Sequence, residues 1–218
     1  MVTALPMRRG YGPTLGQLLA PWWHAASRLG RAAVVAAGVA VLAVAVGAGL
    51  TLENAHYSRG GKVPFSFSYR DLYSVGPEAG ELVKVESRWP SGALKYSYAV
   101  APLTLPAYSG ELTGEIPLYA TGFIHTLAGR LRGFVLRGEG KTRISNKLEG
   151  YQVLYVADVG GEEMFGRDVL LLPPRAGVRE GVVVSMLTSP TASAQVSSPM
   201  EVGETGVLLR PLKTLAFG

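Results

Sequence analysis

The chain has 218 residues, of which 48% are hydrophobic, with 28 Gly, 14 Pro and no Cys. This composition predicts a loop-rich globular protein with a sizeable core, and it excludes a mostly disordered chain, disulfide bonds and cysteine nucleophiles. The formal net charge is +5, but residues 1–52 hold four arginines and no acidic residue, which leaves only +1 for the rest. Nucleic-acid binding usually needs a basic surface on the folded part, so we expect no nucleic-acid partner.

One uncharged segment dominates the first quarter of the chain. Residues 32–52 consist of Ala, Val, Gly, Leu and a single Thr. A helix of this length measures about 30 Å, which matches the hydrocarbon core of a bilayer. We expect one uncleaved transmembrane helix that contacts the lipid bilayer. The alternative is a signal peptide cleaved after a small residue such as Ala48, which the length of the run and of the preceding head disfavours.

Positive charges predict the orientation of this segment. Four arginines precede it, and two of them, Arg28 and Arg31, lie directly before it. Positive flanks close to a membrane stay in the cytoplasm. We therefore expect residues 1–31 to form a cytoplasmic basic tail and residues 53–62 a polar linker. Residues 63–218 would then form one extracytoplasmic α+β domain at the cell membrane.

The first elements expected after the linker are strands. Phe65, Phe67 and Tyr69 alternate with serine and arginine, which is the period of a strand with one buried face. Two further strands are expected over residues 81–88 and 94–100. Together they predict that the domain opens with sheet structure.

The hydrophobic period then changes to that of a helix. The apolar residues that share one helix face are Ile116, Ala120, Phe123, Ile124, Leu127 and Leu131. Pro117 suits a first turn, and Gly133 is a typical residue after a helix end. Because Gly122 and Gly129 weaken the helix, its stability must come from packing against a sheet.

Short strands follow the helix at regular intervals. They are expected over residues 134–137, 151–159, 164–172 and 182–187. Gly160 and Gly161 predict a tight hairpin, so these strands should form an antiparallel meander. The centres of two of them are apolar on both faces, which indicates a sheet covered on both sides. The helix would cover one face, and either residues 191–196, as a short helix, or the N-terminal hairpin would cover the other. Residues 206–217 should close the sheet.

This order of elements resembles the PsbP-like (Mog1/PsbP) family. The resemblance is carried by the aromatic opening strand, the single helix and the meander with the runs Gly150-Tyr151-Gln152-Val153-Leu154-Tyr155 and Gly166-Arg167-Asp168-Val169-Leu170-Leu171. It implies an antiparallel-sheet α/β/α sandwich over roughly residues 63–217. By analogy it also implies a non-enzymatic accessory or binding protein, because members of that fold mostly serve in such roles.

Motifs for nucleotide or nucleophile chemistry are incomplete. Gly140, Lys141 and Thr142 look like the end of a phosphate-binding loop, but the position that needs the first glycine holds Val135. We interpret these residues as a turn between strands and expect no nucleotide cofactor. His56 and His125 are interpreted as solvated surface histidines rather than catalytic bases.

Acidic residues offer the remaining candidate sites. Asp158, Glu162 and Glu163 flank the expected hairpin turn, with Asp168 on the neighbouring strand, and together they could supply oxygens to a divalent cation. Hairpin tips commonly carry acidic residues merely because the tips are exposed to solvent, so we expect no metal. The spacing of Glu111 and Glu115 does not fix their separation in space, so we do not assign them as a catalytic pair.

The sequence therefore predicts a single-pass membrane protein whose outer domain is a non-catalytic binding or accessory module. No catalytic, cofactor-binding or metal-binding residue is assigned, and the expected partners are the bilayer, through residues 32–52, and an envelope protein. The alternative is an extracytoplasmic hydrolase that uses carboxylates the sequence does not identify. A third hypothesis is an assembly subunit held by helix contacts in the membrane. A cleft with convergent ionisable groups of shifted pKa would favour the enzyme.

Overall fold

The computed structural model describes residues 55–107, 112–145, 148–175 and 177–218. The chain divides into two units, Met1–Glu53 and Asn54–Gly218, and all described residues belong to the second. The expected cytoplasmic tail and transmembrane helix lie outside the described residues. None of the helices within the described ranges combines the length and apolarity needed to cross a membrane.

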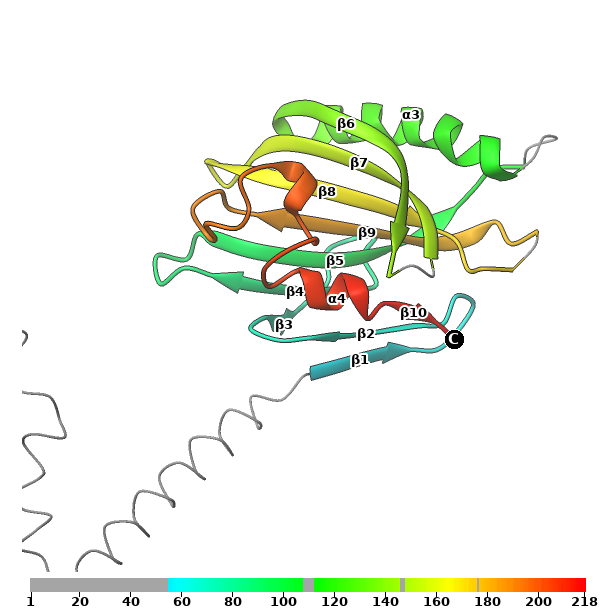
Figure 1. Cartoon of the computed structure of the whole chain (residues 1–218), viewed down its shortest axis with the longest axis horizontal. Helices are drawn as coiled ribbons and strands as arrows, with labels where there is room; N and C mark the ends of the chain where they lie inside the picture. Colours follow the sequence, from blue (N-terminus) through cyan, green and yellow to red (C-terminus); the bar gives the residue numbers. More distant parts are fainter. Residues whose placement is uncertain (1–54, 108–111, 146–147, 176) are drawn as a thin grey trace, which may run out of the picture. The chain divides into compact units, whose positions relative to one another are not determined.

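The centre of the domain is a seven-stranded antiparallel sheet (Figure 1). In spatial order its strands are β3 (Tyr73–Val75), β4 (Val83–Arg88), β5 (Leu94–Thr104), β9 (Glu180–Thr188), β8 (Glu162–Leu171), β7 (Leu148–Val159) and β6 (Arg132–Ile144). The prediction of an antiparallel α+β domain is confirmed. The tight hairpin is confirmed as well, because Val159 pairs with Glu162 and the two glycines between them both have positive φ.

A second, three-stranded sheet has the order β1 (Ala55–Arg59), β2 (Phe65–Tyr69) and β10 (Ala216–Phe217). The linker expected over residues 53–62 is therefore wrong for its central part, which forms β1. Tyr57 explains the difference, because its ring lies 5.8 Å from that of Phe65 and 5.4 Å from that of Phe67. Burial of this aromatic group favours a paired strand over a free linker.

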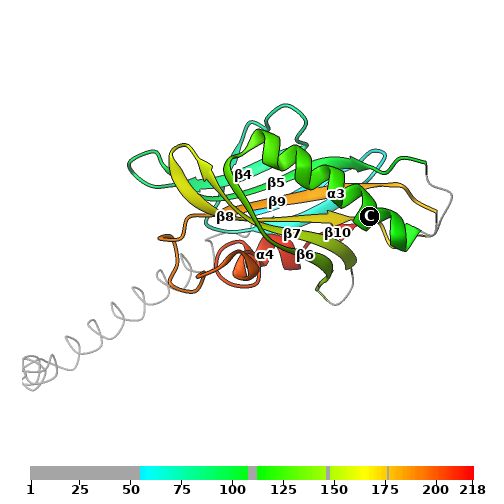
Figure 2. The ribbon, with the colours of Figure 1, turned by 90° about the horizontal axis from the view of Figure 1, so that it is seen from above.

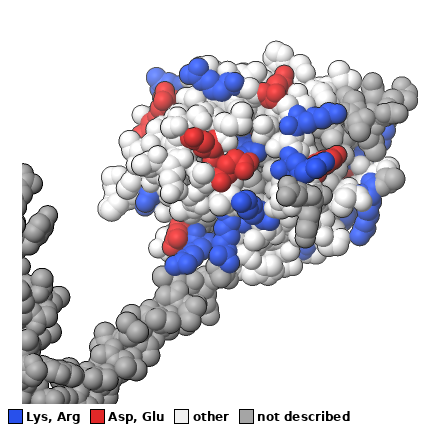
Figure 3. Space-filling model, in the orientation of Figure 1, with Lys and Arg blue, Asp and Glu red and all other residues white. Residues whose placement is uncertain are grey.

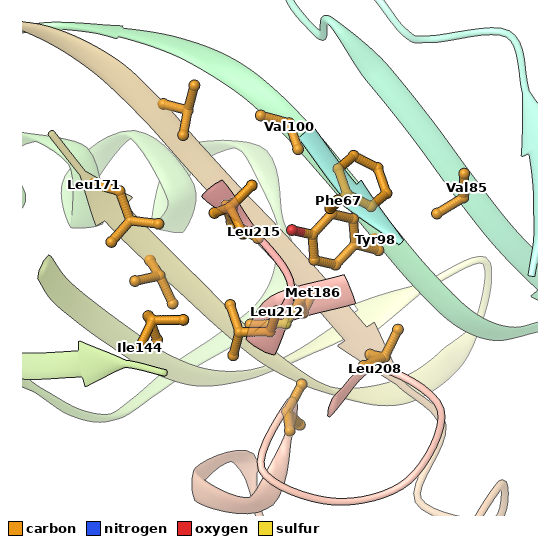
Figure 4. Close-up of a cluster of buried hydrophobic side chains, with 14 of the residues drawn as sticks. Phe67, Val85, Tyr98, Val100, Ile144, Leu171, Met186, Leu208, Leu212 and Leu215 are labelled. Carbon is orange, nitrogen blue, oxygen red and sulfur yellow. The ribbon is translucent and has the colours of Figure 1, made fainter. Parts of the chain in front are cut away.

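The small sheet covers one face of the large sheet together with the C-terminal segment (Figure 4). The rings of Phe67 in β2 and Tyr98 in β5 lie 4.9 Å apart, and both residues are fully buried. Leu212 of helix α4 (Leu209–Lys213) packs into the same cluster. The expectation that residues 206–217 close the large sheet is wrong, since they form α4 and β10. Residues 191–196 form turns instead of a helix, although Val196 joins this core.

Helix α3 (Leu112–Arg130) covers the opposite face of the large sheet (Figure 2). Its predicted apolar face is confirmed, because Ala120 and Leu127 are buried and Phe123 is half-buried against the sheet. The helix begins about one turn earlier than expected, so Pro117 lies inside it. Glu115 in the first turn contributes to this earlier start, since a carboxylate stabilises a helix N-terminus.

The half-buried position of Phe123 gives a testable expectation for the helix. Phe123→Ala should lower the free energy of unfolding by about 1–2 kcal/mol, roughly half of what a fully buried Phe→Ala costs. His125→Ala is the matched control on the exposed side of the same helix and should stay within about 0.5 kcal/mol. Urea unfolding of the three proteins measures both values. A loss above about 3 kcal/mol would mean that the ring is fully buried.

Candidate functional site

A cleft of about 570 Å³ lies between α3 and the large sheet. Tyr119, Phe123 and Arg130 of α3 line one side of it. The hairpin between β4 and β5 and the tip of the β7–β8 hairpin lie at its rim. Ligand pockets for small molecules have volumes of about 300–1,000 Å³, so the cleft has the size of a binding site.

The cleft exists because β5 and β9, which lie beyond the strands that α3 mainly contacts, carry small side chains on this face. Ser97, Ala99 and Ala101 of β5 line its floor, and they alternate along the strand with core residues such as Tyr98 and Val100. α3 contacts mainly β6 and β7, which lie at one edge of the sheet. Small residues beyond the reach of the helix leave a space that apolar side chains would otherwise fill.

The register of the strands brings polar residues into one row on this floor. Lys84 in β4 lies opposite Ala99, Ala99 lies opposite Ser185 in β9, and Ser185 lies opposite Asp168 in β8. In the next row Glu86 lies opposite Ser97. Because neighbouring positions across antiparallel strands share a face, all of these side chains point toward the cleft.

Asp168 is the most unusual group in the cleft. It is 1% exposed, and its Oδ1 accepts a hydrogen bond of 3.2 Å from the Tyr155 hydroxyl. Ser185 also hydrogen bonds to it. Burial raises the pKa of Asp168 to about 7, while the bonds from Ser185 and Tyr155 and the charge of Arg130 limit the rise. The carboxyl therefore changes its charge near neutral pH.

Gly166 allows Tyr155 to reach Asp168. Gly166 and Tyr155 are direct cross-strand partners, and a Cβ atom on Gly166 would lie 2.2 Å from the Tyr155 ring. The absence of a side chain lets the ring lie across the neighbouring strand, with its hydroxyl at Asp168. Burial, followed by the nearby Asp168 carboxyl, raises the pKa of Tyr155 well above its ordinary value, so the hydroxyl stays protonated and donates.

The second buried carboxylate of the floor, Glu86, forms ion pairs with neighbouring cations. Its Oε1 lies 2.5 Å from Nε of Arg88, and its Oε2 lies 4.0 Å from Nζ of Lys84, which also pairs with Glu78. Asp168 forms no comparable ion pair within the described ranges. Elsewhere on the domain, basic and acidic side chains are interspersed over the face seen in Figure 3.

The structure separates the four acidic residues considered as metal ligands. Asp158 accepts a hydrogen bond of 2.8 Å from the backbone N–H of Gly161, so it stabilises the hairpin turn. Glu162 and Glu163 are exposed at the same tip. Asp168 lies five residues beyond Glu163, about 17 Å along the strand. In the part of the chain that the structure describes, no three acidic or histidine side chains gather as a metal site would require.

The other sequence candidates lie outside the cleft. Gly140, Lys141 and Thr142 belong to β6, which corrects the expectation of a turn there. His125 is exposed as predicted, and His56 is exposed on β1, where it bonds to Ser68. Glu115 is buried and pairs with Arg179 at 2.7 Å. Its proposed companion, Glu111, lies outside the described residues.

Sequence reasoning considered Asp168 as a possible metal ligand and missed its buried position in the cleft, although one signal was present. Asp168 is a charged residue directly before the apolar run Val169, Leu170 and Leu171 in a strand expected to be covered on both faces. An ionisable group at the centre of such a strand must be paired, protonated or functional. Its neighbours in space could not be read from the sequence, because they depend on strand register.

Comparisons with known proteins do not assign a family. No protein-family model matches the chain, and no curated protein matches it. Among solved structures it is similar to a protein of unknown function from Pseudomonas aeruginosa, PA94, with 11% sequence identity and a TM-score of 0.36. That match covers 64% of this chain and 85% of the other.

Proposed function

We propose that this protein is a membrane-anchored binding module whose outer domain holds a small polar ligand in the cleft between α3 and the large sheet. The observation that carries the proposal is Asp168, a buried carboxyl with a raised pKa that lines an open cleft. A buried ionisable group is costly to a fold, and such groups concentrate where proteins bind or transform other molecules. The rest of the lining combines aromatic, aliphatic and small residues with further charged groups such as Glu86 and Arg130, and ligand sites usually pair an apolar surface with a few polar groups in this way.

Membrane anchorage is the second part of the proposal. It rests on the uncharged run at residues 32–52 and on the arginines before it. The resemblance to PsbP-like proteins, which are mostly accessory or binding proteins, supports a role without catalysis. An anchored module would present its cleft to ligands or envelope proteins outside the cytoplasm.

Protease protection tests the proposed orientation. Protease added to intact spheroplasts should digest the outer domain and leave the N-terminal tail uncut, as detected by epitope tags at the two ends. Lysed spheroplasts are the control and should lose both tags. Digestion of the N-terminal tag alone would contradict the orientation, and a mature N-terminus near residue 49 would show a cleaved signal instead of an anchor.

A cleft-filling variant tests the binding site. Ala99→Phe places a ring on the cleft floor, so it should abolish binding of any cleft ligand while the domain remains folded. Ala128→Phe is the matched control, because Ala128 is exposed on α3 and is not among the cleft-lining residues. Isothermal titration against small amines, carboxylates, sugars and alcohols measures the effect. No binding by any class, or equal binding by both variants, would contradict the proposal.

The pKa of Asp168 also favours a second candidate, an extracytoplasmic hydrolase. A carboxyl with a pKa of about 7 is suited to general acid–base catalysis at neutral pH, and Ser185 and Tyr155 supply hydroxyl groups beside it. If the protein is a binding module, the wild type should turn over chromogenic ester, glycoside and phosphate substrates no faster than Asp168→Asn does. Turnover that depends on Asp168, with an inflection near pH 7, would favour the hydrolase.

A further inference from the structure

Resting on the binding function proposed above, we propose that the ligand of the cleft is a small organic cation whose ammonium group pairs with the Asp168 carboxylate. One of the two buried carboxylates on the cleft floor has no ion-pair partner among the described residues, and the cleft has aromatic walls. These two features select positive charge, and they arise from different residues.

Charge compensation is uneven between the two buried carboxylates. Glu86 lies beside Arg88 and Lys84, at 2.5 and 4.0 Å. Among the residues that the structure describes, Asp168 receives hydroxyl hydrogen bonds from Tyr155 and Ser185, and Arg130 acts on it without an ion pair. A buried carboxylate without a paired cation is strongly disfavoured. A ligand cation would remove this penalty, whereas an anion would be repelled by the Asp168 carboxylate.

Aromatic side chains supply the second feature. Tyr119 and Phe123 of α3 and Tyr155 of β7 all line the cleft. The faces of such rings attract ammonium groups, and their apolar surface accommodates the carbon atoms around the nitrogen. An inorganic metal ion lacks that apolar part and needs several oxygen ligands, which the described residues do not gather. An organic cation therefore fits the cleft better than a metal.

Proton and ligand should compete for the same carboxylate. The groups that face Asp168 are Tyr155 from β7, Ser185 from β9 and Arg130 from α3, with Lys84 and Glu86 further along the floor on β4. The pKa of Asp168 is about 7, so its charge forms as the pH rises through that value. Affinity for a permanent cation should therefore fall about 30-fold from pH 8.5 to pH 5.5, because the protonated fraction rises in that interval.

Isothermal titration of the full-length chain in detergent micelles tests this inference with two matched probe pairs. The first pair is choline and its neutral isostere 3,3-dimethylbutan-1-ol, and the second is benzylamine and benzyl alcohol. At least one cation should bind ten or more times tighter than its isostere at pH 8.5, and should show the expected loss at pH 5.5. Choline has a permanent charge and benzylamine is mostly protonated over this pH range, more so at pH 5.5 than at pH 8.5, so a loss of affinity at pH 5.5 reports on the protein.

Variants distinguish the contribution of the Asp168 carboxylate to binding from that of the cleft as a whole. Asp168→Asn should remove both the preference for the cation and the pH dependence, whereas Asp158→Asn, the same change at the hairpin turn, should alter neither. Isosteres that bind as tightly as the cations, or anions that bind in their place, would overturn the inference. If Ala99→Phe abolishes this binding of isosteres or anions, the proposed binding function stands, but the inference that the ligand is a cation does not. If nothing binds, both proposals fail.

Discussion

Gly181→Ala is expected to lower the free energy of unfolding by about 3 kcal/mol or more. Gly181 is buried near the start of β9, and a Cβ atom there would lie 2.0 Å from the backbone oxygen of Leu171. That oxygen belongs to β8, so it can move only if the two central strands of the sheet separate. Urea unfolding of the wild type and the variant measures the loss.

Gly140→Ala provides the matched control in the same sheet. Gly140 lies in the edge strand β6 with no atom within 4 Å of a built Cβ, and its φ is not in the left-handed region. Glycine weakens a strand by about 0.5–1 kcal/mol relative to alanine, so this variant should be as stable as the wild type or slightly more so. A neutral effect of Gly181→Ala would show that β8 and β9 are further apart than described.

Asp168→Asn should stabilise the protein above neutral pH, although it removes a charged group from the centre of the domain. The pKa of Asp168 rises from 3.8 to about 7 on folding, so the folded state binds the proton more tightly than the unfolded state does. Stability of the wild type should therefore fall as the pH rises from about 4 to about 7, by up to about 4 kcal/mol. The amide of Asn carries no charge and avoids this loss.

Denaturant unfolding of both proteins between pH 4 and pH 9 measures this difference. The two should be similar in stability near pH 4, and the variant should be more stable at pH 8. Glu78 and Glu201, whose pKa values are lowered by hydrogen bonds from Lys84 and from Ser197, titrate alike in both proteins and cancel. Asp158→Asn controls for the same change at an exposed turn. A constant difference across the pH range would show that Asp168 is not buried as a carboxyl.

The sequence predicts those elements whose hydrophobic period is strong. The alternation of Tyr96 and Tyr98 with polar residues locates β5, and the helical spacing of Ala120 and Leu127 locates the buried face of α3. Strand β6 extends well beyond the expected residues 134–137 because both of its faces are largely polar, so period 2 is not visible. Propensity and pattern cannot detect a strand that is stabilised mainly by pairing along one edge.

The cleft could not be predicted, because it depends on distances between elements. Asp168 and Tyr155 are recognisable as unusual strand residues, but only the register that places Gly166 opposite Tyr155 brings the hydroxyl to the carboxyl. The sequence therefore contains the polar groups of the candidate site, while the fold determines which of them meet.

The pairing of the C-terminal strand β10 with β2 has a consequence for how the protein folds during its synthesis. Phe65 pairs with Phe217, 152 residues later in the sequence, and β5 pairs with β9 across a shorter but still long separation, since Tyr96 lies opposite Thr188. Contacts between distant residues slow folding, since long loops must close before the pairing stabilises them. During synthesis Phe65 and Phe67 emerge long before their last partners, so we expect the nascent domain to stay incompletely folded until the final strand is available. Chaperone dependence of its folding in cells would follow from this topology rather than from low stability of the finished domain.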